Sequence, residues 1–225
     1  MTHDIPLRAL CEKKDDDDSL WVAHFGGLFD PVHLGHMGIG KALLEKYSFD
    51  KVVYVPGSSH YPKPGLASEA TRLALLQISI KNEPRFEVCD YELGKNDWTE
   101  PFETLMYLKD KYKQEAKNVR MFTIRGDDWL PNMMNWTSEL VEHEGLYEFI
   151  IVPRINPHIK DVPVNSGTMN IVSRMSYLME SHEPLEVSSS LVRERLRNGD
   201  VSGIPVPASV LDEIQRQGLY GVDSA

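Results

Sequence analysis

Short apolar runs alternate with helical patterns along most of this chain, and the alternation limits the folds that it can adopt. Runs rich in β-branched and aromatic residues are typical of buried strands. The candidate strands are residues 20–25, 51–56, 86–93, 119–124 and 147–153, with a shorter candidate at 185–187. Helical patterns lie between them, near residues 35–47, 68–81, 101–114 and 137–144. This order of strands and helices predicts an α/β fold in which a doubly wound parallel sheet carries helices on both faces.

The last part of the chain predicts two further helices. The first, near residues 189–197, begins in serines and ends at Asn198-Gly199, and the second begins near Pro207 and ends at Gly218. These residues match the usual start and stop chemistry of helices. We therefore expect a small C-terminal helical portion after the sheet.

Length and composition favour a single domain. The 225 residues, of which 41% are apolar, can bury one sizeable core. A block of charge from Lys13 to Asp18 precedes the first apolar run, so residues 1–18 are predicted to form a solvated, poorly ordered extension. Residues 19–225 then form one domain, and a partner-binding role of the extension is left open.

Charge and cysteine content exclude several classes of protein. The formal net charge of -10 argues against a general nucleic-acid binder, which normally has a basic face, but is compatible with a local pocket for phosphates. Cys11 and Cys89 lack metal-ligand spacing, so neither a disulfide framework nor a structural zinc site is expected. No apolar run approaches a secretory signal or the roughly 18 residues of a membrane span. The protein is expected to be cytoplasmic, with no membrane partner.

The segment that follows the first strand predicts an anion site. It reads GGLFDPVHLGH and leads into a helix at the carboxyl end of the sheet, where ligands bind in open α/β folds. Gly26 and Gly27 permit close backbone approach and unusual dihedral angles, and the helix start near Gly35 offers unpaired N–H groups to an anion. His33 and His36 share one face of that start and can donate hydrogen bonds to charge that develops on a phosphate. A zinc site is the weaker interpretation, because the pair lacks an obvious third ligand.

This segment resembles the GGxFDPxHxGH signature of the nicotinate and nicotinamide mononucleotide adenylyltransferases, within the nucleotidyltransferase superfamily that carries an HxGH motif. The motif here is His33-Leu34-Gly35-His36, and the resemblance extends over roughly residues 21–222. It implies a Rossmann-like fold, ATP binding by this loop, and catalytic roles for both histidines. The residues on the ATP-binding positions of the loop are Gly26, Gly27, Phe29, His33 and His36.

A second motif near the C-terminus resembles the ISSTxxR signature of the same family. It reads EVSSSLVRERL, with Ser188, Ser189, Ser190 and Arg193 on the matching positions. Serine hydroxyls and N–H groups at a helix start, followed by the fork of an arginine, suit a triphosphate. The resemblance implies that this motif binds the ATP phosphates and that Arg193 is catalytic. The alternative is an ordinary serine cap followed by an exposed arginine.

Residues between the two motifs resemble the pyridine mononucleotide pocket of the family. The stretch RGDDWLPNMMNW resembles a GxDxL element followed by a tryptophan, which implies ribose contacts from the aspartate and stacking of the tryptophan on the pyridine ring. The stretch NDWTEP resembles a Trp-Thr element, whose Thr99 could also cap the next helix. Arg72 is a further candidate for a phosphate contact. The predicted mononucleotide-binding residues are Lys63, Trp98, Thr99, Gly126, Asp128, Leu130, Trp136 and Arg154.

The resemblance implies adenylyl transfer in NAD biosynthesis, with nicotinate mononucleotide, and the nicotinamide form as a second candidate, as acceptor of the AMP moiety of ATP. The attacking phosphate is ionised at neutral pH, so no strong base is required. Mg²⁺ is expected to arrive with ATP, without a dedicated protein site. The expected partners are thus ATP and a pyridine mononucleotide, and a homo-oligomer is compatible with the sequence. The alternatives are another HxGH nucleotidyltransferase and a nucleotide sensor on the same fold.

Overall fold

The computed structural model of this chain describes residues 7–60, 65–95, 97, 99–130, 141–153, 166–180 and 187–222. Its strands are β1 (Arg8–Ala9), β2 (Leu20–Gly27), β3 (Lys51–Pro56), β4 (Phe86–Val88), β5 (Val119–Gly126), β6 (Glu148–Val152) and β7 (Ser176–Leu178). Its helices are α1 (Leu34–Lys46), α2 (Glu69–Ile80), α3 (Pro101–Tyr112), α6 (Ser166–Met175), α7 (Ser189–Arg197) and α8 (Ala208–Gln217), with short 3₁₀ helices η1 (Asp127–Trp129) and η3 (Leu219–Gly221).

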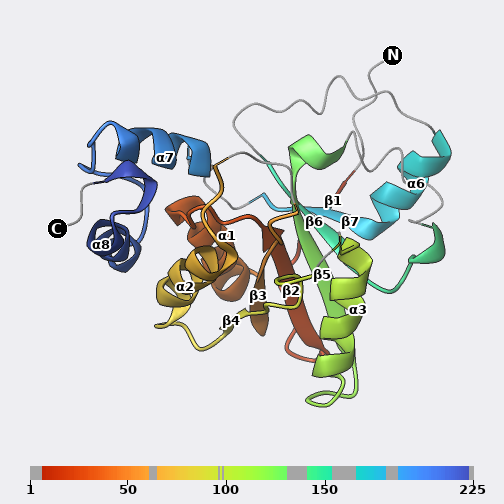
Figure 1. Cartoon of the computed structure of the whole chain (residues 1–225). Coiled ribbons are helices and arrows are strands. Elements are labelled where there is room, and N and C mark those ends of the chain that lie inside the picture. The colour runs from red at the N-terminus through yellow and green to blue at the C-terminus, as the bar shows by residue number, and fades with distance from the viewer. Residues whose placement is uncertain are drawn as a thin grey trace. The chain divides into compact units, whose positions relative to one another are not determined.

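Within the described residues, the strands form one seven-stranded sheet in the order β1-β7-β6-β5-β2-β3-β4 (Figure 1). The pairs β1–β7, β7–β6, β6–β5, β5–β2 and β3–β4 are parallel, which confirms the predicted class of fold. From β2 the chain first adds β3 and β4 on one side, and then returns to add β5, β6 and β7 on the other. Ligands of open α/β sheets bind where the strand order reverses in this way, at the carboxyl ends of the strands. A ligand site is therefore expected after Gly27, the last residue of β2.

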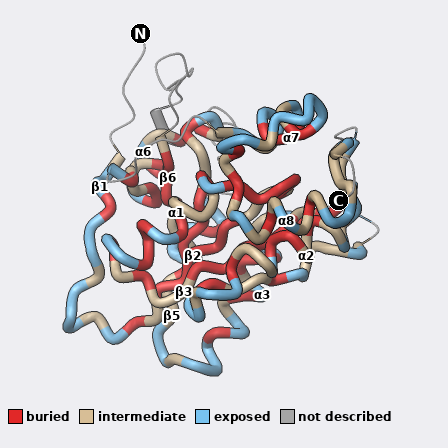
Figure 2. The backbone as a smooth tube through the Cα atoms, turned by 90° about the vertical axis from the view of Figure 1, so that its left-hand side faces the viewer, coloured by how far each residue is buried: buried red, intermediate tan, exposed pale blue. Residues whose placement is uncertain are grey.

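The chain divides into two compact units, each assembled from distant stretches of sequence. Unit 1 contains Met1–Phe25, Ala42–Lys51 and Glu100–Pro184, and unit 2 contains Gly26–Lys41, Val52–Thr99 and Leu185–Ala225. Figure 2 shows that β2 and β3 are buried along most of their length. The assignment of residues 19–225 to one domain stays a prediction.

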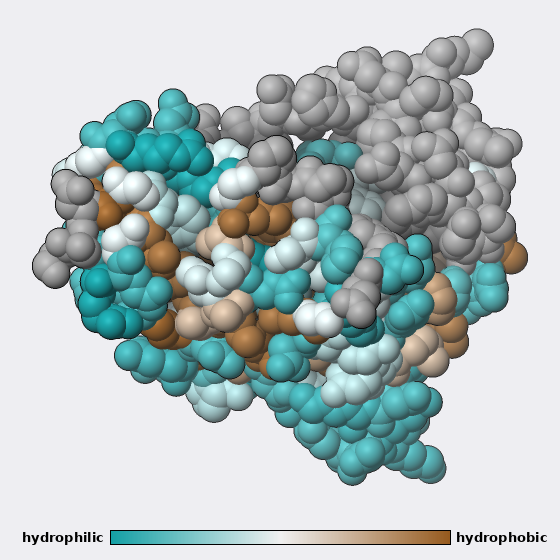
Figure 3. Space-filling view, viewed as in Figure 1, coloured by the Kyte–Doolittle hydropathy of each residue, from teal (hydrophilic) through white to brown (hydrophobic). Residues whose placement is uncertain are grey.

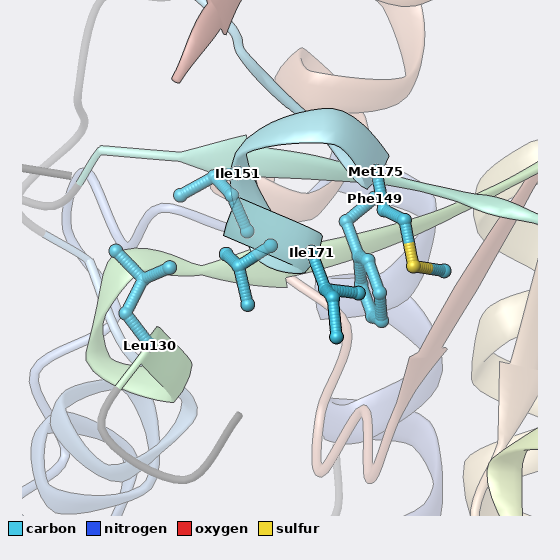
Figure 4. Packing of buried hydrophobic residues seen from close by; sticks show 6 residues of the cluster. Leu130, Phe149, Ile151, Ile171 and Met175 are labelled. Carbon is cyan, nitrogen blue, oxygen red and sulfur yellow. The ribbon is translucent and has the colours of Figure 1, made fainter. Parts of the chain in front are cut away.

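The core of unit 1 includes a cluster between β6 and α6 (Figure 4). β6 reads EFIIV, an almost unbroken apolar run, because a parallel strand is covered on both faces. Burying one such apolar side chain stabilises the fold by about 1.5–3 kcal/mol. The fully or nearly buried members of the cluster are Leu130, Phe149, Ile151, Ile171, Val172 and Met175.

Helices α2, α7 and α8 belong to unit 2, in which α2 packs against α8 and β4 (Figure 1). α8 ends at Gly218, whose left-handed backbone (φ 61°) closes the helix as the sequence predicts. α7 buries Val192 and Leu196 and exposes Glu194 and Arg197. The surface over α7, at the upper left of Figure 3, is mainly hydrophilic. Arg193, which follows Val192 and precedes Leu196 by three residues, lies on the same buried face of the helix.

Residues 7–18, part of the segment that the sequence predicts to be a poorly ordered extension, make contacts with the sheet. Arg8–Ala9 form β1, which pairs in parallel with β7 at the edge of the sheet. Lys13 forms an ion pair with Asp50, in which Nζ and Oδ2 are 2.7 Å apart. The segment before β2 is thus attached to unit 1 by the backbone pairing of Arg8–Ala9 and by the ion pair of Lys13. Both contacts involve residues distant in the sequence, which composition does not reveal.

The strand predicted at residues 86–93 is shorter in the structure. Only Phe86–Val88 pair with β3, and the chain then turns, with the Leu93 N–H donating to the Asp90 carbonyl. A turn of this kind competes with strand pairing because it uses the same backbone groups.

The elements after β6 differ most from the prediction. β7 and α6 were not predicted, since the buried Ser176 and the polar start of α6 interrupt the apolar pattern. Val187 of the strand candidate 185–187 lies in no strand, and residues 185–186 lie outside the described residues. Of the helix predicted near 137–144, residues 141–142 are helical and residues 137–140 lie outside the described residues.

A histidine is buried inside the sheet of unit 1. His24 on β2 is 1% exposed, and its Nδ1 lies 2.9 Å from Thr123 Oγ1 on β5. Its Nε2 has no hydrogen-bond partner among the described residues. Burial, together with the positive charge of Arg125, lowers the pKa of His24 to about 3. The folded protein therefore keeps this ring neutral under conditions in which an exposed histidine takes up a proton.

We expect His24 to make the fold less stable in mild acid. The unfolded side chain returns to a pKa of about 6.5, so protonation favours the unfolded state as the pH falls from there towards the folded value of about 3. The contribution of His24 to stability is complete above about pH 6.5, and about 2 kcal/mol of it is lost between about pH 7 and pH 5. Urea unfolding at both pH values measures the loss, and His24→Gln should remove this part of it.

The exposed His60 supplies the matched control. His60→Gln should keep the pH dependence of the wild-type protein. An unchanged pH dependence in His24→Gln as well would show that His24 does not cause it.

Candidate active site

The loop after β2 takes its shape from Gly27 and Phe29. Phe29 has a left-handed backbone (φ 48°), and its ring lies against Gly27, where an added Cβ would be 3.2 Å from Phe29 Cζ. Gly26 and Gly27 are not left-handed themselves, so the unusual dihedral angle predicted for them falls on Phe29 instead. The Phe29 ring also meets the His36 ring edge-on, with centroids 4.9 Å apart. The buried Phe29 side chain thus supports the histidine motif from inside unit 2.

His33 and His36 stack on each other at the start of α1. Their ring centroids are 3.6 Å apart and their planes differ by 19°, which confirms that they share one face. The His33 N–H donates to Nδ1 of His36 at 3.2 Å, and the His36 N–H is 3.4 Å from Nδ1 of His33. A ring nitrogen that accepts a hydrogen bond carries no proton, so each neutral ring holds its proton on Nε2. Each histidine is therefore a donor through Nε2.

The start of α1 offers fewer N–H groups to an anion than the sequence predicts. The first four N–H groups of an α-helix have no partner inside the helix. Here the N–H groups of Leu34, His36 and Met37 donate to the carbonyl oxygens of Pro205 and His33. Gly35 contributes the one N–H of the four that has no partner among the described residues. Anion binding at this helix start is thus confined to a single N–H and the two rings.

Arg72 on α2 is a structural residue, which corrects its predicted phosphate contact. It is fully buried, and its guanidinium donates to the carbonyl oxygens of Leu28 and Gly57, both at 2.7 Å, and of Ala67 at 3.3 Å. Burial lowers the pKa of Arg72, and the nearby carboxylate of Asp30 opposes that shift. Because its donors connect the loops that follow β2 and β3, they are not directed at a substrate.

The three serines of the second motif form the start of α7, and each hydroxyl has a partner within unit 2. Ser188 is the N-cap, whose Oγ accepts the N–H three residues further on at 3.2 Å. Ser189 Oγ donates to the Pro31 carbonyl at 3.0 Å, and Ser190 Oγ accepts from Nη2 of Arg193 at 3.3 Å. The cap interpretation thus holds for Ser188, while Ser189 attaches α7 to the loop after β2.

Arg193 reaches from α7 to the same loop, so the alternative of an exposed arginine is wrong. Its side chain is 10% exposed, and Nη1 donates to the Asp30 carbonyl at 2.6 Å. Nη1 also lies 3.5 Å from Asp30 Oδ2, but this oxygen accepts no hydrogen bond from a described residue. The two charges therefore attract each other without a hydrogen bond between them. Oδ1 of Asp30 accepts from the Ala67 N–H at 3.2 Å and from the Tyr220 hydroxyl at 2.8 Å.

The sequence prediction missed the roles of Asp30 and Tyr220 in this network. Asp30 lies inside the first motif, but its partner Tyr220 is 190 positions further along the chain. The signal for Tyr220 is weak: it stands between Gly218 and Gly221, which indicate a turn and nothing more.

The described residues of the predicted mononucleotide pocket are distributed over the two units. In unit 1, β5 ends at Gly126 and Asp128 is exposed on η1, whereas Leu130 is fully buried in the core. In unit 2, Thr99 is buried but does not cap α3, whose N-cap is Glu100. The hydroxyl of Thr99 has no partner among the described residues. Lys63, Trp98, Trp136 and Arg154 lie outside the described residues.

The family model described as cytidylyltransferase-like matches residues 24–195, which is more than half of the chain. The chain belongs to the cytidylyltransferase-like family. The matching region contains the loop after β2, the two stacked histidines and most of the second motif. The family assignment and the geometry therefore concern the same residues.

Two curated proteins are similar in sequence to this chain over most of its length. A Dehalococcoides mccartyi protein named probable nicotinate-nucleotide adenylyltransferase is 31% identical over 206 residues, which cover 90% of this chain and 98% of that protein. A Clostridium acetobutylicum protein of the same name is 26% identical over 200 residues, covering 88% of this chain and 98% of its own.

Solved structures support the fold. Plasmodium falciparum nicotinic acid mononucleotide adenylyltransferase, complexed with APC, matches with a TM-score of 0.66 and 18% identity over 90% of this chain and 98% of that one. The complex of the same protein with NaAD gives a TM-score of 0.65 and 17% identity, with the same coverage. At these identities the likeness establishes the architecture alone.

Among the residues that the structure describes, no group of three or more His, Cys, Asp or Glu side chains could hold a metal ion. None of the described helices has the length and apolar character that crossing a bilayer requires.

Proposed function

We propose that this protein transfers the AMP moiety of ATP to nicotinate mononucleotide and releases pyrophosphate. The observation that carries the proposal is the stacked pair of His33 and His36, on a loop to which Ser189 and Arg193 are hydrogen bonded. Two imidazole donors beside a cation and hydroxyls are suited to a polyphosphate. The names of the D. mccartyi and C. acetobutylicum relatives support nicotinate mononucleotide as the second substrate.

The reaction is an in-line displacement at the α-phosphorus of ATP. An oxygen of the mononucleotide 5′-phosphate forms a bond to this phosphorus. The bond to the oxygen that bridges the α- and β-phosphates breaks, and pyrophosphate leaves with that electron pair. The nucleophile is ionised near neutral pH, so no side chain has to remove a proton from it. Catalysis then depends on holding two polyanions in line and on stabilising the charge that moves to pyrophosphate.

The described residues of unit 2 take distinct roles in this proposal. The Nε2–H groups of His33 and His36 donate to oxygens of the α- and β-phosphates, and the Gly35 N–H adds a donor at the positive end of α1. Gly26 and Gly27 bring the backbone close to ATP. Phe29 supports the His36 ring, and the exposed Ser188 and Ser190 with Arg193 face the outer phosphates. The hydrogen bonds and burial described above support these assignments.

The mononucleotide requires a second set of contacts. The exposed carboxylate of Asp128 can accept hydrogen bonds from ribose hydroxyls, with Gly126 allowing the nucleotide to approach the end of β5. The unpartnered hydroxyl of Thr99 is a candidate donor or acceptor for the nucleotide. The other proposed contacts are stacking by Trp98 and Trp136, phosphate contacts by Lys63 and Arg154, and backbone contacts at Leu130.

Mg²⁺ fits the site as a companion of ATP. Asp30, the acidic group of the phosphate loop, is buried and already accepts hydrogen bonds from Ala67 and Tyr220 through Oδ1, while Oδ2 lies near the cation of Arg193. A Mg²⁺ ion bound to ATP would therefore take its ligands from phosphate oxygens and water, and it would neutralise part of the triphosphate charge. We further propose a reducing cytoplasmic location, in which Cys11 and Cys89, neither of which forms a disulfide in the structure, persist as thiols.

We expect the purified protein to release pyrophosphate from MgATP in the presence of nicotinate mononucleotide. Its kcat/KM for this nucleotide should exceed that for nicotinamide mononucleotide by at least about tenfold, or about 1.4 kcal/mol in transition-state binding. The acid form carries an additional carboxylate, whereas the amide form needs both a donor and an acceptor from the site. Coupled pyrophosphate assays with both nucleotides measure the ratio.

Other results would point to the alternatives. Pyrophosphate release with phosphopantetheine, or from CTP, but not with pyridine nucleotides would assign the chain to another reaction of the superfamily. Tight ATP binding without turnover on any mononucleotide would indicate a sensor. A tenfold preference for the amide form would retain adenylyl transfer and reverse the choice of pyridine nucleotide.

A further inference from the structure

The last described turn of the chain is fastened to the phosphate loop. Tyr220 lies in η3 with a left-handed backbone (φ 59°), which a residue other than glycine adopts only with support from its surroundings. Its hydroxyl donates to Asp30 Oδ1 at 2.8 Å. Burial and the neighbouring carboxylate raise the pKa of Tyr220, so the phenol keeps its proton and acts as the donor. Tyr220 thus keeps an unfavourable backbone conformation in which its hydroxyl donates to Asp30 Oδ1.

The Asp30 carboxylate lies close to three groups that can donate to it. The Tyr220 hydroxyl and the Ala67 N–H both bind Oδ1 of Asp30, while Oδ2 stays 3.5 Å from Nη1 of Arg193. Carboxylates and guanidinium groups otherwise form short, paired hydrogen bonds, and these are among the strongest in proteins. Arg193 instead donates to the Asp30 carbonyl and to Ser190 Oγ. Something must keep the carboxylate from closing on Arg193.

We propose that Tyr220 is a positioning residue, which holds the Asp30 carboxylate away from Arg193 and so keeps the guanidinium available for the phosphates of ATP. The proposal rests on the function proposed above. Without the hydroxyl, Oδ1 loses a donor, and the carboxylate turns towards the cation 3.5 Å away. Arg193 then becomes the partner of Asp30, and the turn that leads into His33 loses its attachment to the end of the chain. ATP binding should suffer, and mononucleotide binding should not.

The chain contains a matched control for a purely structural effect. The Tyr177 hydroxyl donates to Glu148 Oε1, also at 2.8 Å. Tyr177 and Tyr220 are both half-buried, and both bind a carboxylate. Tyr177 belongs to unit 1, whereas Asp30, Arg193 and Tyr220 belong to unit 2. Removing either hydroxyl therefore deletes the same kind of hydrogen bond, and only one deletion concerns the phosphate loop.

The test compares Tyr220→Phe and Tyr177→Phe in the full chain. Thermal unfolding should show similar, small losses of stability for the two variants. Tyr220→Phe should raise the KM for MgATP by about tenfold, the scale of one hydrogen bond to a charged group, with the KM for nicotinate mononucleotide within about twofold of wild type. Tyr177→Phe should leave both KM values within about twofold. Equal kinetic parameters in the two variants would overturn the proposal.

Two measurements on the protein without mononucleotide separate this proposal from the proposed function. Amide hydrogen exchange in peptides that cover residues 26–36 should be faster in Tyr220→Phe than in wild type or Tyr177→Phe. Direct titration should show weaker binding of MgATP to Tyr220→Phe alone. Both hold even if the wild-type protein transfers AMP to none of the mononucleotides. Unchanged exchange together with unchanged MgATP affinity would refute the positioning role.

Discussion

Replacing His36 with alanine is expected to lower kcat for adenylyl transfer by about 10²- to 10³-fold. Nδ1 of His36 accepts the His33 N–H, which leaves the proton of the neutral ring on Nε2 as the donor of this side chain. This donor acts most strongly when charge moves from the α-phosphate to pyrophosphate, so the KM for ATP should change much less than kcat. Steady-state kinetics and MgATP titration measure the two effects separately.

The His36 ring also packs on Phe29 and His33, so its removal has a structural component. His36→Gln keeps an N–H donor and should retain more activity than His36→Ala. Substitution of the exposed Leu34, which lies between the histidines, to alanine should leave kcat nearly unchanged. Near-normal turnover of a folded His36→Ala protein would remove His36 from the mechanism.

Replacing Arg193 with alanine should impair both stability and ATP use. Removing one member of a buried ion pair costs about 3–5 kcal/mol when the other charge is left uncompensated. Asp30, which is 2% exposed, would be left with Ala67 and Tyr220 as partners. We expect the free energy of unfolding to fall by about 3 kcal/mol, the lower end of this range, because Nη1 of Arg193 lies 3.5 Å from Asp30 Oδ2 without a hydrogen bond. The kcat/KM for ATP should fall by about 10²-fold or more.

Arg193→Lys distinguishes charge from geometry. A lysine keeps the positive charge, but a single ammonium cannot reproduce the planar fork that reaches the Asp30 carbonyl and Ser190 Oγ together. It should restore most of the stability and only part of the ATP use. Arg197→Ala, at an exposed position of α7, is the control and should resemble wild type. Full recovery of kcat/KM in Arg193→Lys would show that charge alone matters.

The central strands could be predicted because burial on both faces produces a local signal. β3 coincides with the predicted run 51–56, and β2 and β5 each extend the predicted run by two residues. Edge elements give no such signal. β1 and β7 have two and three residues, and such short strands form only where another backbone lies within hydrogen-bonding distance.

The sequence predicts the types of side chain at the candidate site, but not the long-range hydrogen bonds that connect them. The stacking of His33 and His36 follows from their spacing at a helix start. The partner of Tyr220 does not follow from any spacing, because Asp30 lies 190 positions away. Likewise, the side chain of Leu130 belongs to the core of unit 1, although its motif suggested a substrate contact.

The order of the central strands and helices, the glycine-rich loop after β2, and the imidazole, hydroxyl and guanidinium groups available to bind phosphate follow from residues that are close together in the chain. Which of these groups hold the protein together, and which can face a substrate, depends on how distant segments pack. Arg72 is committed to the backbone carbonyls of three loop residues, whereas Arg193 shares its donors between Asp30 and Ser190. A guanidinium binds whichever acceptors folding brings within about 3 Å of it, and for both arginines acceptors come from distant segments of the chain.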